Sequence, residues 1–179
     1  EMNASYGKFG TAGFLGNATD EGQCKANWDN AHVMGIGSWG PTKIPIAVDV
    51  WKKNYTAIRA ANRFLAKADS IPDSDNPLIN SQIRQRMKGE ATFLRAFFYA
   101  DLLKYFGGVP IVTDVLDQND DEILFEPRET YDACVDFISA ELEKALPLLP
   151  NANEYSDSEF GRITKGAALA LSCKIRLYA

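Results

Sequence analysis

Histidine is almost absent from this chain of 179 residues, in which His32 is the single example. A Ser/His/Asp or Cys/His catalytic unit would have to use that one imidazole, and zinc chemistry would lack its usual second histidine. Cysteine is scarce too: Cys24, Cys134 and Cys173 are far apart and odd in number, so they form neither a disulfide framework nor a C-x-x-C metal site. We therefore expect buried thiols, no cofactor and no histidine-dependent catalysis.

Long apolar runs are absent as well. The most aromatic stretch, residues 93–106, is interrupted by Arg95, Asp101 and Lys104. A membrane-spanning helix needs about 18 or more apolar residues in succession. The sequence therefore predicts no membrane span.

Positive charge is in deficit. Nineteen Lys and Arg residues stand against 24 Asp and Glu residues, which gives a formal net charge of −5. A surface of this sign repels a phosphate backbone, so we expect no nucleic-acid partner and favour a neutral or cationic one. The apolar fraction of 46% and the charged fraction of 24% are typical of a globular domain and exclude a disordered or collagen-like chain.

The length predicts one domain, at about 150 residues per domain. The chain opens at Glu1 without a basic and apolar leader, and its last residues lie inside a helical pattern that has no cap. We therefore expect an excerpt of a longer protein.

Helical periodicity organises most of the chain after residue 45. Apolar side chains recur at steps of three and four residues, which predicts helices over about 46–68, 83–106, 130–146 and from 164 onward. The other stretches lack this period and are rich in turn-forming or acidic residues. The predicted organisation is a loop-rich segment 1–45 with one short helix, a first helix pair 46–106, a loop 107–129 and a second, truncated helix pair 130–179.

Strand-like sequence is nearly absent, so the predicted fold is all-α, with the helices paired as consecutive hairpins. The two pairs carry an internal echo, because Lys88-Gly89-Glu90-Ala91 lines up with Lys165-Gly166-Ala167-Ala168 at a shift of 77 residues. Repeated helix pairs build an α-α superhelix in which neither pair buries its apolar face alone. The shift exceeds two tetratricopeptide periods of about 34 residues, so we predict irregular tetratricopeptide-like hairpins with long loops.

The loop-rich first segment holds the candidate ligand site. Trp28 and Trp39 lie among polar residues, including Asn30, in a stretch too irregular to bury both indoles. An indole stacks against the C–H face of a sugar while neighbouring amides bond its hydroxyls. We therefore predict Trp28, Asn30 and Trp39 as ligand-binding residues. The alternative is that both indoles pack the loop onto the helices.

Other motifs have structural explanations. Residues 35–40 match G-x-G-x-x-G, but no β-branched run precedes them, so we predict an aromatic loop rather than a dinucleotide site. The aromatic residues between 93 and 106 predict core packing, and Glu90, Arg95 and Asp101 predict ion pairs. The acidic run after residue 116 lacks the EF-hand spacing, so we predict solvated charge and no metal site.

Three segments carry a resemblance to a known family. Residues 88–113, KGEATFLRAFFYADLLKYFGGVPIVT, resemble the signature segment of the SusD/RagB family. Residues 51–62, WKKNYTAIRAAN, are similar to the first long helix of that family, and residues 161–168, GRITKGAA, resemble a later helix start. The resemblance extends over about residues 20–179.

The resemblance implies an outer-membrane lipoprotein on the cell surface of Bacteroidetes-type bacteria. Members cap a TonB-dependent SusC-like transporter and capture glycans or other nutrients without catalysis. The lipid-bearing cysteine and the second half of the family's scaffold are missing from this sequence, so we expect membrane attachment only through an anchor absent from this excerpt. Loops before the first long helix contribute to the family's ligand site, and Trp28, Asn30 and Trp39 occupy that stretch here.

Our first hypothesis is thus a non-enzymatic nutrient-binding protein that captures oligosaccharide and delivers it to a SusC-like transporter. A second is a helical-repeat adaptor whose groove binds a peptide or protein. A third, an α-helical glycoside hydrolase, needs two carboxylates flanking a cleft, and the sequence places no such pair.

Overall fold

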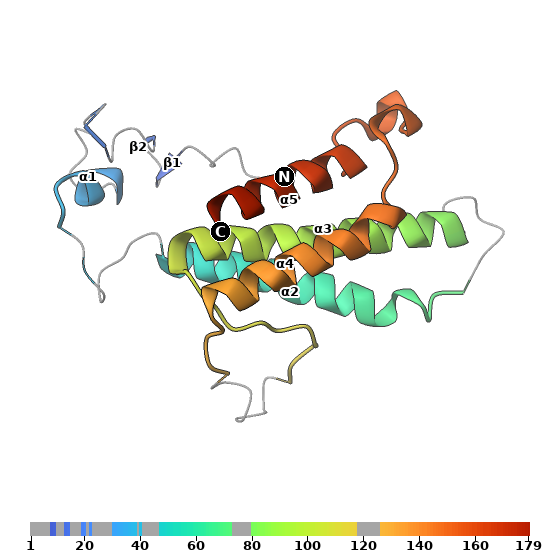
Figure 1. The fold of residues 1–179 in the computed structure, drawn as a ribbon, viewed down its shortest axis with the longest axis horizontal. Coiled ribbons are helices and arrows are strands. Elements are labelled where there is room, and N and C mark those ends of the chain that lie inside the picture. Colours follow the sequence, from blue (N-terminus) through green and yellow to red (C-terminus); the bar gives the residue numbers. More distant parts are fainter. Residues whose placement is uncertain are drawn as a thin grey trace. The chain divides into compact units, whose positions relative to one another are not determined.

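The computed structural model describes residues 8–9, 13–14, 19–20, 22, 30–38, 40, 47–72, 80–117 and 126–179. The chain divides into two compact units, residues 1–52 and 53–179. Its long helices are α2 (Ala47–Ala68), α3 (Ser81–Phe106), α4 (Tyr131–Ala145) and α5 (Lys165–Tyr178) (Figure 1). The predicted fold of helical hairpins is confirmed, and each of these helices lies where the periodicity placed it.

Before α2, the described residues of the first unit form two very short strands and one short helix. β1 (Lys8–Phe9) pairs antiparallel with β2 (Gly13–Phe14), and α1 (Asn30–Gly35) contacts β2. The sequence predicted the short helix in this segment. It did not predict the strand pair, because two residues per strand are too few for an alternating pattern to be read.

Side-chain caps fix where the helices of the second unit begin. The side chains of Asn80, Thr130 and Thr164 accept hydrogen bonds from the backbone N–H groups three residues further on, at 2.9, 3.1 and 3.2 Å. Each cap satisfies one of the N–H groups that the first turn of a helix leaves without a partner. The prediction that helices begin near Thr130 and Thr164 is therefore confirmed, with each threonine as the N-cap.

The end of α3 depends on a glycine in the left-handed region. Gly107 has φ of 66°, and its N–H donates to the carbonyl of Leu103 at 3.0 Å. A residue with a Cβ would be strained at this φ, so glycine is suited to the position. The stop that Gly107-Gly108 predicted lies directly after Phe106.

Successive helices of the second unit run in opposite directions, and α3 lies at the centre of the packing (Figure 1). It contacts α4, α5 and the 3-10 turn η3 (Leu146–Leu148). The core is built from the aliphatic and aromatic stripes of the helices, with Ile58, Ala96, Tyr99, Leu102, Ile138 and Leu142 almost fully buried. Among the described residues, no helix is long and apolar enough to cross a membrane.

The internal echo extends to the first helix of each pair. α2 ends at Ala68 and α4 ends at Ala145, which are 77 residues apart, and both alanines are fully buried. About three and two turns earlier, buried Ile58 and Ala61 correspond to buried Val135 and Ile138 at the same shift. The two hairpins are therefore two copies of one structural unit, as the sequence echo indicated.

Two expectations need correction. Cys134 is buried as predicted, but Cys173 on α5 is exposed, because the face of α5 on which it lies has no neighbour among the described residues. The aromatic set of α3 is also only partly core. Phe93 and Tyr99 are buried, whereas Phe97, Phe98 and Phe106 are half-buried and Tyr105 is 46% exposed.

Candidate functional site

The structure places little of the predicted ligand site. Trp28 and Trp39 lie outside the described residues, and Asn30 is the first residue of α1 with a side chain outside them. Their role as ligand-binding residues therefore stays a prediction. What is described is the short helix between them and, in the second unit, the helical scaffold.

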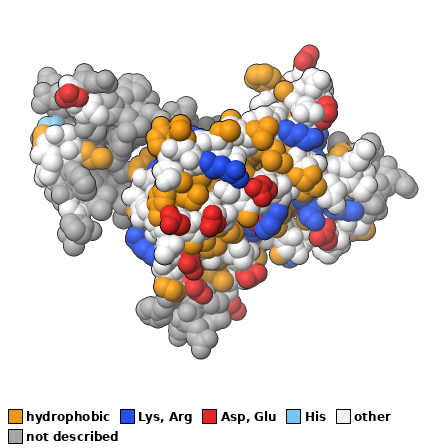
Figure 2. Space-filling view, in the orientation of Figure 1, with side chains coloured by type: hydrophobic (Ala, Val, Ile, Leu, Met, Phe, Trp, Pro, Cys, Tyr) orange, Lys and Arg blue, Asp and Glu red, His pale blue; other side chains and the backbone are white. Residues whose placement is uncertain are grey.

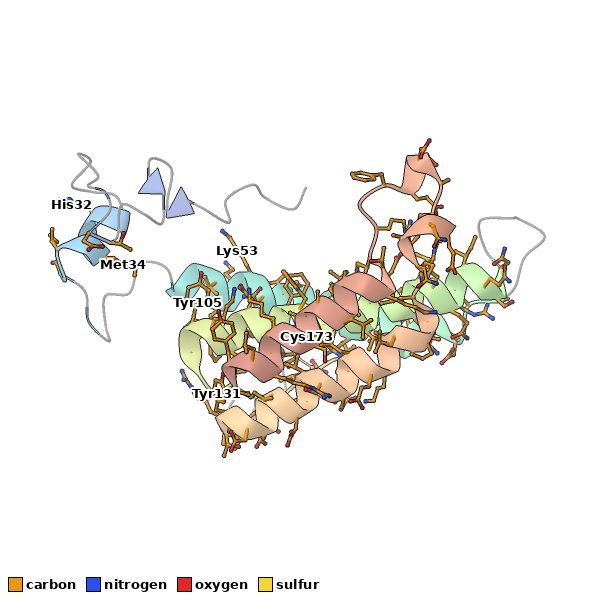
Figure 3. All side chains as sticks on the ribbon, turned by 45° about the horizontal axis from the view of Figure 1, so that its top comes forward. His32, Met34, Lys53, Tyr105, Tyr131 and Cys173 are labelled. Carbon is orange, nitrogen blue, oxygen red and sulfur yellow. The ribbon has the colours of Figure 1, made fainter. Side chains whose placement is uncertain are left out.

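The backbone turns sharply after α1. The N–H of Gly37 donates to the carbonyl of Met34, and the N–H of Ser38 donates to the carbonyl of Val33, both at 3.0 Å. His32 and Met34, half-buried, lie on the helix just before this turn (Figure 3). The G-x-G-x-x-G match thus begins at the last residue of a helix rather than at the end of a strand, which is the wrong context for a dinucleotide site.

In the second unit, one face of α2 holds the loop that follows α3. Tyr55 donates its hydroxyl to the carbonyl of Pro110 at 2.7 Å, and Arg59 donates to the carbonyl of Leu116 at 2.7 Å. Asn62 donates to the carbonyls of Val112 and Asp114 at 2.9 and 3.3 Å. Because these three donors recur at steps of three and four residues, they form one helical stripe that fixes residues 110–116 in an extended path.

Tyr99 completes the attachment of this loop from the side of α3. Its hydroxyl accepts from the N–H of Val112 at 2.7 Å and lies 3.2 Å from the same residue's carbonyl oxygen. Burial raises the pKa of Tyr99 to about 12, although the backbone of Val112 and the nearby charge of Arg95 act to lower it. Burial also raises the pKa of Tyr55, whose ring meets Tyr99 edge to face at 6.3 Å between centroids. Both phenols therefore stay protonated at neutral pH and act as hydrogen-bonding groups of the scaffold.

The two buried carboxylates among the described residues of the second unit, Glu141 and Asp101, are both engaged in ion pairs. Glu141 accepts from Arg95 at 2.7 Å and from Lys144 at 3.0 Å. Asp101 accepts from the amide of Asn54 at 2.9 Å, and Lys104 lies 2.6 Å from its other oxygen. This confirms the predicted ion pairing, and it leaves neither carboxylate placed as a free general acid or base.

A third carboxylate attaches the connector between α4 and α5. Glu90 receives two bonds from Arg162, at 2.9 and 2.6 Å, in the bidentate geometry typical of strong pairs. Tyr155 donates to the carbonyl of Ile163 at 2.7 Å and to Glu90 at 3.3 Å, and burial with the charge of Glu90 raises the pKa of its hydroxyl. The connector also contains two short 3-10 turns, η4 (Ala152–Glu154) and η5 (Asp157–Glu159), each closed by a capping box.

A cavity of about 330 Å³ lies between α3, the start of α4 and the end of α5. Its lining combines apolar side chains with charged and phenolic ones and includes Phe97, Leu103, Leu171, Ile175, Asp101, Lys104, Lys174, Tyr131 and Tyr178. Tyr131 donates to the carbonyl of Tyr178 at 3.2 Å, which joins the start of α4 to the end of α5. Tyr105 and Tyr131 lie near the same end of the helical unit (Figure 3). The cavity is therefore largely apolar, and the carboxylate in its lining, Asp101, is already paired with Lys104.

Sequence reasoning missed the partners of these polar residues rather than the residues themselves. Asn62 is a polar residue in the apolar stripe of α2, and such a position is a signal for a buried hydrogen-bonding role. The capping boxes were also readable, since Asn151 and Ser156 each precede a glutamate by three residues. Within the part of the chain that is described, no group of three His, Cys, Asp or Glu residues could hold a metal ion.

These features define a helical-repeat protein built from irregular tetratricopeptide-like hairpins. The family model described as "Starch-binding associating with outer membrane", a SusD-like family, matches residues 18–177. The chain belongs to this family.

Known relatives agree with this assignment. SusD-like protein P38 of Formosa agariphila is 30% identical over 72% of this chain. The crystal structure of a SusD-like protein from Bacteroides fragilis superposes with a TM-score of 0.64, at 38% identity over 74% of this chain. A structure described as a laminarin-binding SusD-like protein superposes with a TM-score of 0.71, at 27% identity over 86% of this chain. The chain spans only 22%, 24% and 31% of these three proteins, respectively.

Proposed function

We propose that the protein containing this chain is a non-catalytic, glycan-binding protein of the outer-membrane surface. The observation that carries the proposal is the similarity to SusD-like proteins over most of the chain, including one described as laminarin-binding. In this proposal the protein captures oligosaccharide and passes it to a SusC-like TonB-dependent transporter. Attachment to the membrane would come from a lipid anchor outside these residues.

The described helices support a scaffold role in this function. Their buried and half-buried acids are paired with arginine or lysine, and Asp101 also accepts from the amide of Asn54, so these acids do not form the two-carboxylate arrangement that glycoside hydrolysis requires. Hydrogen bonds from α2 and α3 hold the backbone of residues 110–116 in one conformation. A rigid scaffold suits a binder, because a preorganised site loses little entropy when ligand arrives.

In the proposal the ligand itself is held by the segment around α1. Trp28 and Trp39 stack on sugar rings, and Asn30 bonds their hydroxyls. Stacking of this kind contributes modestly per residue, about 0.5–1.5 kcal/mol beyond area burial, so several contacts are needed for useful affinity. A preference for chains of several sugar units is therefore expected.

The experiment is titration calorimetry of the complete protein with laminarin and a panel of other oligosaccharides. Trp28→Ala, Trp39→Ala and Asn30→Ala are each expected to lower the affinity at least about tenfold for the oligosaccharide that binds best, which corresponds to about 1.4 kcal/mol. Trp51→Phe is the matched control, since Trp51 lies in α2 and is half-buried. Unchanged affinity in all three loop variants would exclude this loop as the ligand site, while the glycan-binding function would stand.

The adaptor alternative makes the opposite prediction. A helical-repeat adaptor would bind a peptide or folded protein and would show no heat with any glycan. Co-purification with a SusC-like transporter in detergent tests the transporter partnership separately, because it does not depend on which ligand is bound.

A further inference from the structure

One edge of the extended segment after α3 is held by the helices. The carbonyls that accept hydrogen bonds from α2 belong to every second residue, namely Pro110, Val112, Asp114 and Leu116. The N–H of Val112 faces the same way, since it donates to Tyr99 of α3. In an extended chain, successive residues direct their backbone groups to opposite sides. The backbone groups of residues 111 and 113 therefore face away from α2 and α3.

These outward N–H and C=O groups of Ile111 and Thr113 form an outer edge. No described residue makes a hydrogen bond to any of the four groups. Ile111 is half-buried and Thr113 is exposed, and the path bends at Asp114, directly after the edge. A row of such groups is a template for another strand, because a second backbone supplies donors and acceptors at the matching spacing.

The chain itself pairs with this edge at one point. The N–H of Glu129 donates to the carbonyl of Val109 at 3.3 Å, so continued antiparallel pairing would place residue 127 opposite Ile111. Residue 127 is proline, which has no N–H to give to the carbonyl of Ile111. The two described limbs of the loop separate from here (Figure 1). The edge thus accepts a backbone donor at Val109, while the described part of the returning limb does not pair with Ile111.

The edge is also preorganised. Val109 at its start is completely buried. Tyr55, Asn62 and Tyr99 hold the opposite side of the segment through bonds of 2.7, 2.9 and 2.7 Å. A strand that is already extended and fixed loses little conformational entropy when a second strand adds to it.

Charge indicates which kind of strand fits. Residues 107–129 contain seven Asp and Glu residues and a single basic residue, Arg128. Acidic side chains also predominate over the lower part of the face in Figure 2, where this loop lies in Figure 1. A peptide rich in lysine or arginine is attracted to such a loop, and an acidic peptide is repelled.

We propose that the outer edge of residues 109–113 is a docking site for an extended, cationic peptide segment of a partner protein, which adds to the edge as a β-strand. The N–H and C=O groups of Ile111 and Thr113 bond the backbone of that segment. Its β-branched side chains pack beside those of Ile111 and Thr113, and its cations lie over the acidic loop. The inference does not depend on the proposed glycan-binding function, because it uses none of the predicted ligand-binding residues.

Amide hydrogen exchange, followed by NMR in the protein expressed from its complete reading frame, tests the site. The probe is a blocked seven-residue peptide that alternates lysine with valine, KVKVKVK. Without the probe, the amides of Ile111 and Thr113 are expected to exchange at least about tenfold faster than that of Val112, which Tyr99 holds. Saturating probe should slow the first two amides at least about tenfold and leave Val112 little changed.

Two altered probes separate strand pairing from adsorption through side chains. Methyl groups on the amide nitrogens of the two central residues remove donors from both edges of the peptide and keep every side chain. This probe should bind at least about tenfold more weakly than KVKVKVK in titration calorimetry. The acidic peptide EVEVEVE should lose at least about as much, because the loop repels it.

Variants of the protein give the matching test. Thr113→Pro removes one N–H from the outer edge and should lower the affinity for KVKVKVK at least about tenfold. Thr113→Val is the matched control, since it keeps the N–H and the β-branched shape at an exposed position, and it should bind the probe as the parent protein does. If urea denaturation shows that Thr113→Pro does not fold, the methylated probe makes the same test on the unchanged protein.

Several results would overturn the inference. Slow exchange of Ile111 and Thr113 without probe, at any protein concentration, would mean that the same polypeptide covers the edge. Slow exchange that disappears on dilution would assign the edge to a second copy. Failure of KVKVKVK to slow these two amides, or equal binding of the methylated or the acidic probe, would mean that the edge does not receive a cationic strand.

Discussion

Arg95 of α3 donates its Nε to Glu141 of α4 at 2.7 Å, and Glu141 is only 1% exposed. The same guanidinium donates to the amide oxygen of Asn62 on α2 at 2.9 Å. Lys144 supplies a second cation to the carboxylate at 3.0 Å. One half-buried arginine thus links three consecutive helices, from both hairpins, at a single point.

Removal of Arg95 should therefore destabilise the protein strongly. Arg95→Met keeps much of the apolar stem but leaves a buried carboxylate with only the partly exposed Lys144 as partner. The expected loss is about 3–5 kcal/mol in the free energy of unfolding, measured by urea denaturation. The matched control is Arg176→Met, which removes an exposed pair with Glu143 and should cost about 1 kcal/mol or less. Equal losses in the two variants would contradict a buried role for Arg95.

The helices were readable from local sequence, whereas this link was not. Apolar steps of three and four residues, together with Thr130, Thr164 and Gly107 as caps, set the helix ends to within one or two residues. Those signals act over one or two turns of chain. The partner of Arg95 lies 46 residues away on another helix, and only the packing of the hairpins identifies it.

The candidate ligand site was predictable only as a type of chemistry. Indoles and amides between Trp28 and Trp39 indicate sugar binding, but the positions of their side chains depend on a segment with no repeating pattern. The exposure of Cys173 was missed for a different reason. Periodicity shows that a helix face is apolar, but it does not show whether another element packs on that face.

The contact between Gly89 and Leu148 predicts a steric penalty. Gly89→Ala brings a Cβ to 2.7 Å from the Cβ of Leu148, inside α3 where alanine would otherwise favour the helix. We expect overpacking to exceed the propensity gain and to cost about 1–3 kcal/mol in unfolding experiments.

The matched test of that explanation is the double variant with Leu148→Gly. Deletion of the Leu148 Cβ removes the clashing atom, so Gly89→Ala should be neutral or stabilising in the Leu148→Gly background. Leu148→Ala keeps the Cβ and should leave the penalty in place. A penalty of the same size in all three backgrounds would mean that the clash is elsewhere.

Tyr99 should make the fold sensitive to alkaline pH. Burial raises its pKa from 10.0 to about 12, so between these values the folded state holds a proton that the unfolded state has lost. The unfolded state then binds fewer protons, and stability falls as the pH rises. The contribution of the protonated phenol to folding stability is complete below about pH 10 and is lost as the pH approaches 12.

Phenolate absorbance in the folded protein measures this. It is expected to show late titration of a subset of the seven tyrosines, and Tyr99→Phe should reduce that subset. Titration of all tyrosines near pH 10 in the folded protein would contradict the burial of Tyr99.

The hydrogen bond from Asn54 to Asp101 predicts that the variant Asn54→Asp loses folding stability in a pH-dependent way. Asn54 is 6% exposed, and its amide donates to Asp101 at 2.9 Å, so Asn54→Asp sets two carboxylates against each other at nearly constant volume. Repulsion raises the folded-state pKa of the pair, so the unfolded state binds fewer protons above the ordinary carboxyl range, near 4. The destabilisation is therefore absent at low pH, grows as the pH rises from about 4, and reaches roughly 3 kcal/mol near neutrality. Urea denaturation curves at several pH values measure this loss of stability.

The control is the double variant with Asn54→Asp and Asp101→Asn, in which the two residues are exchanged. It restores one carboxylate and one amide and should recover most of the lost stability. A pH-independent loss, or no recovery in the exchanged variant, would show that the amide of Asn54 does not serve as the partner of Asp101.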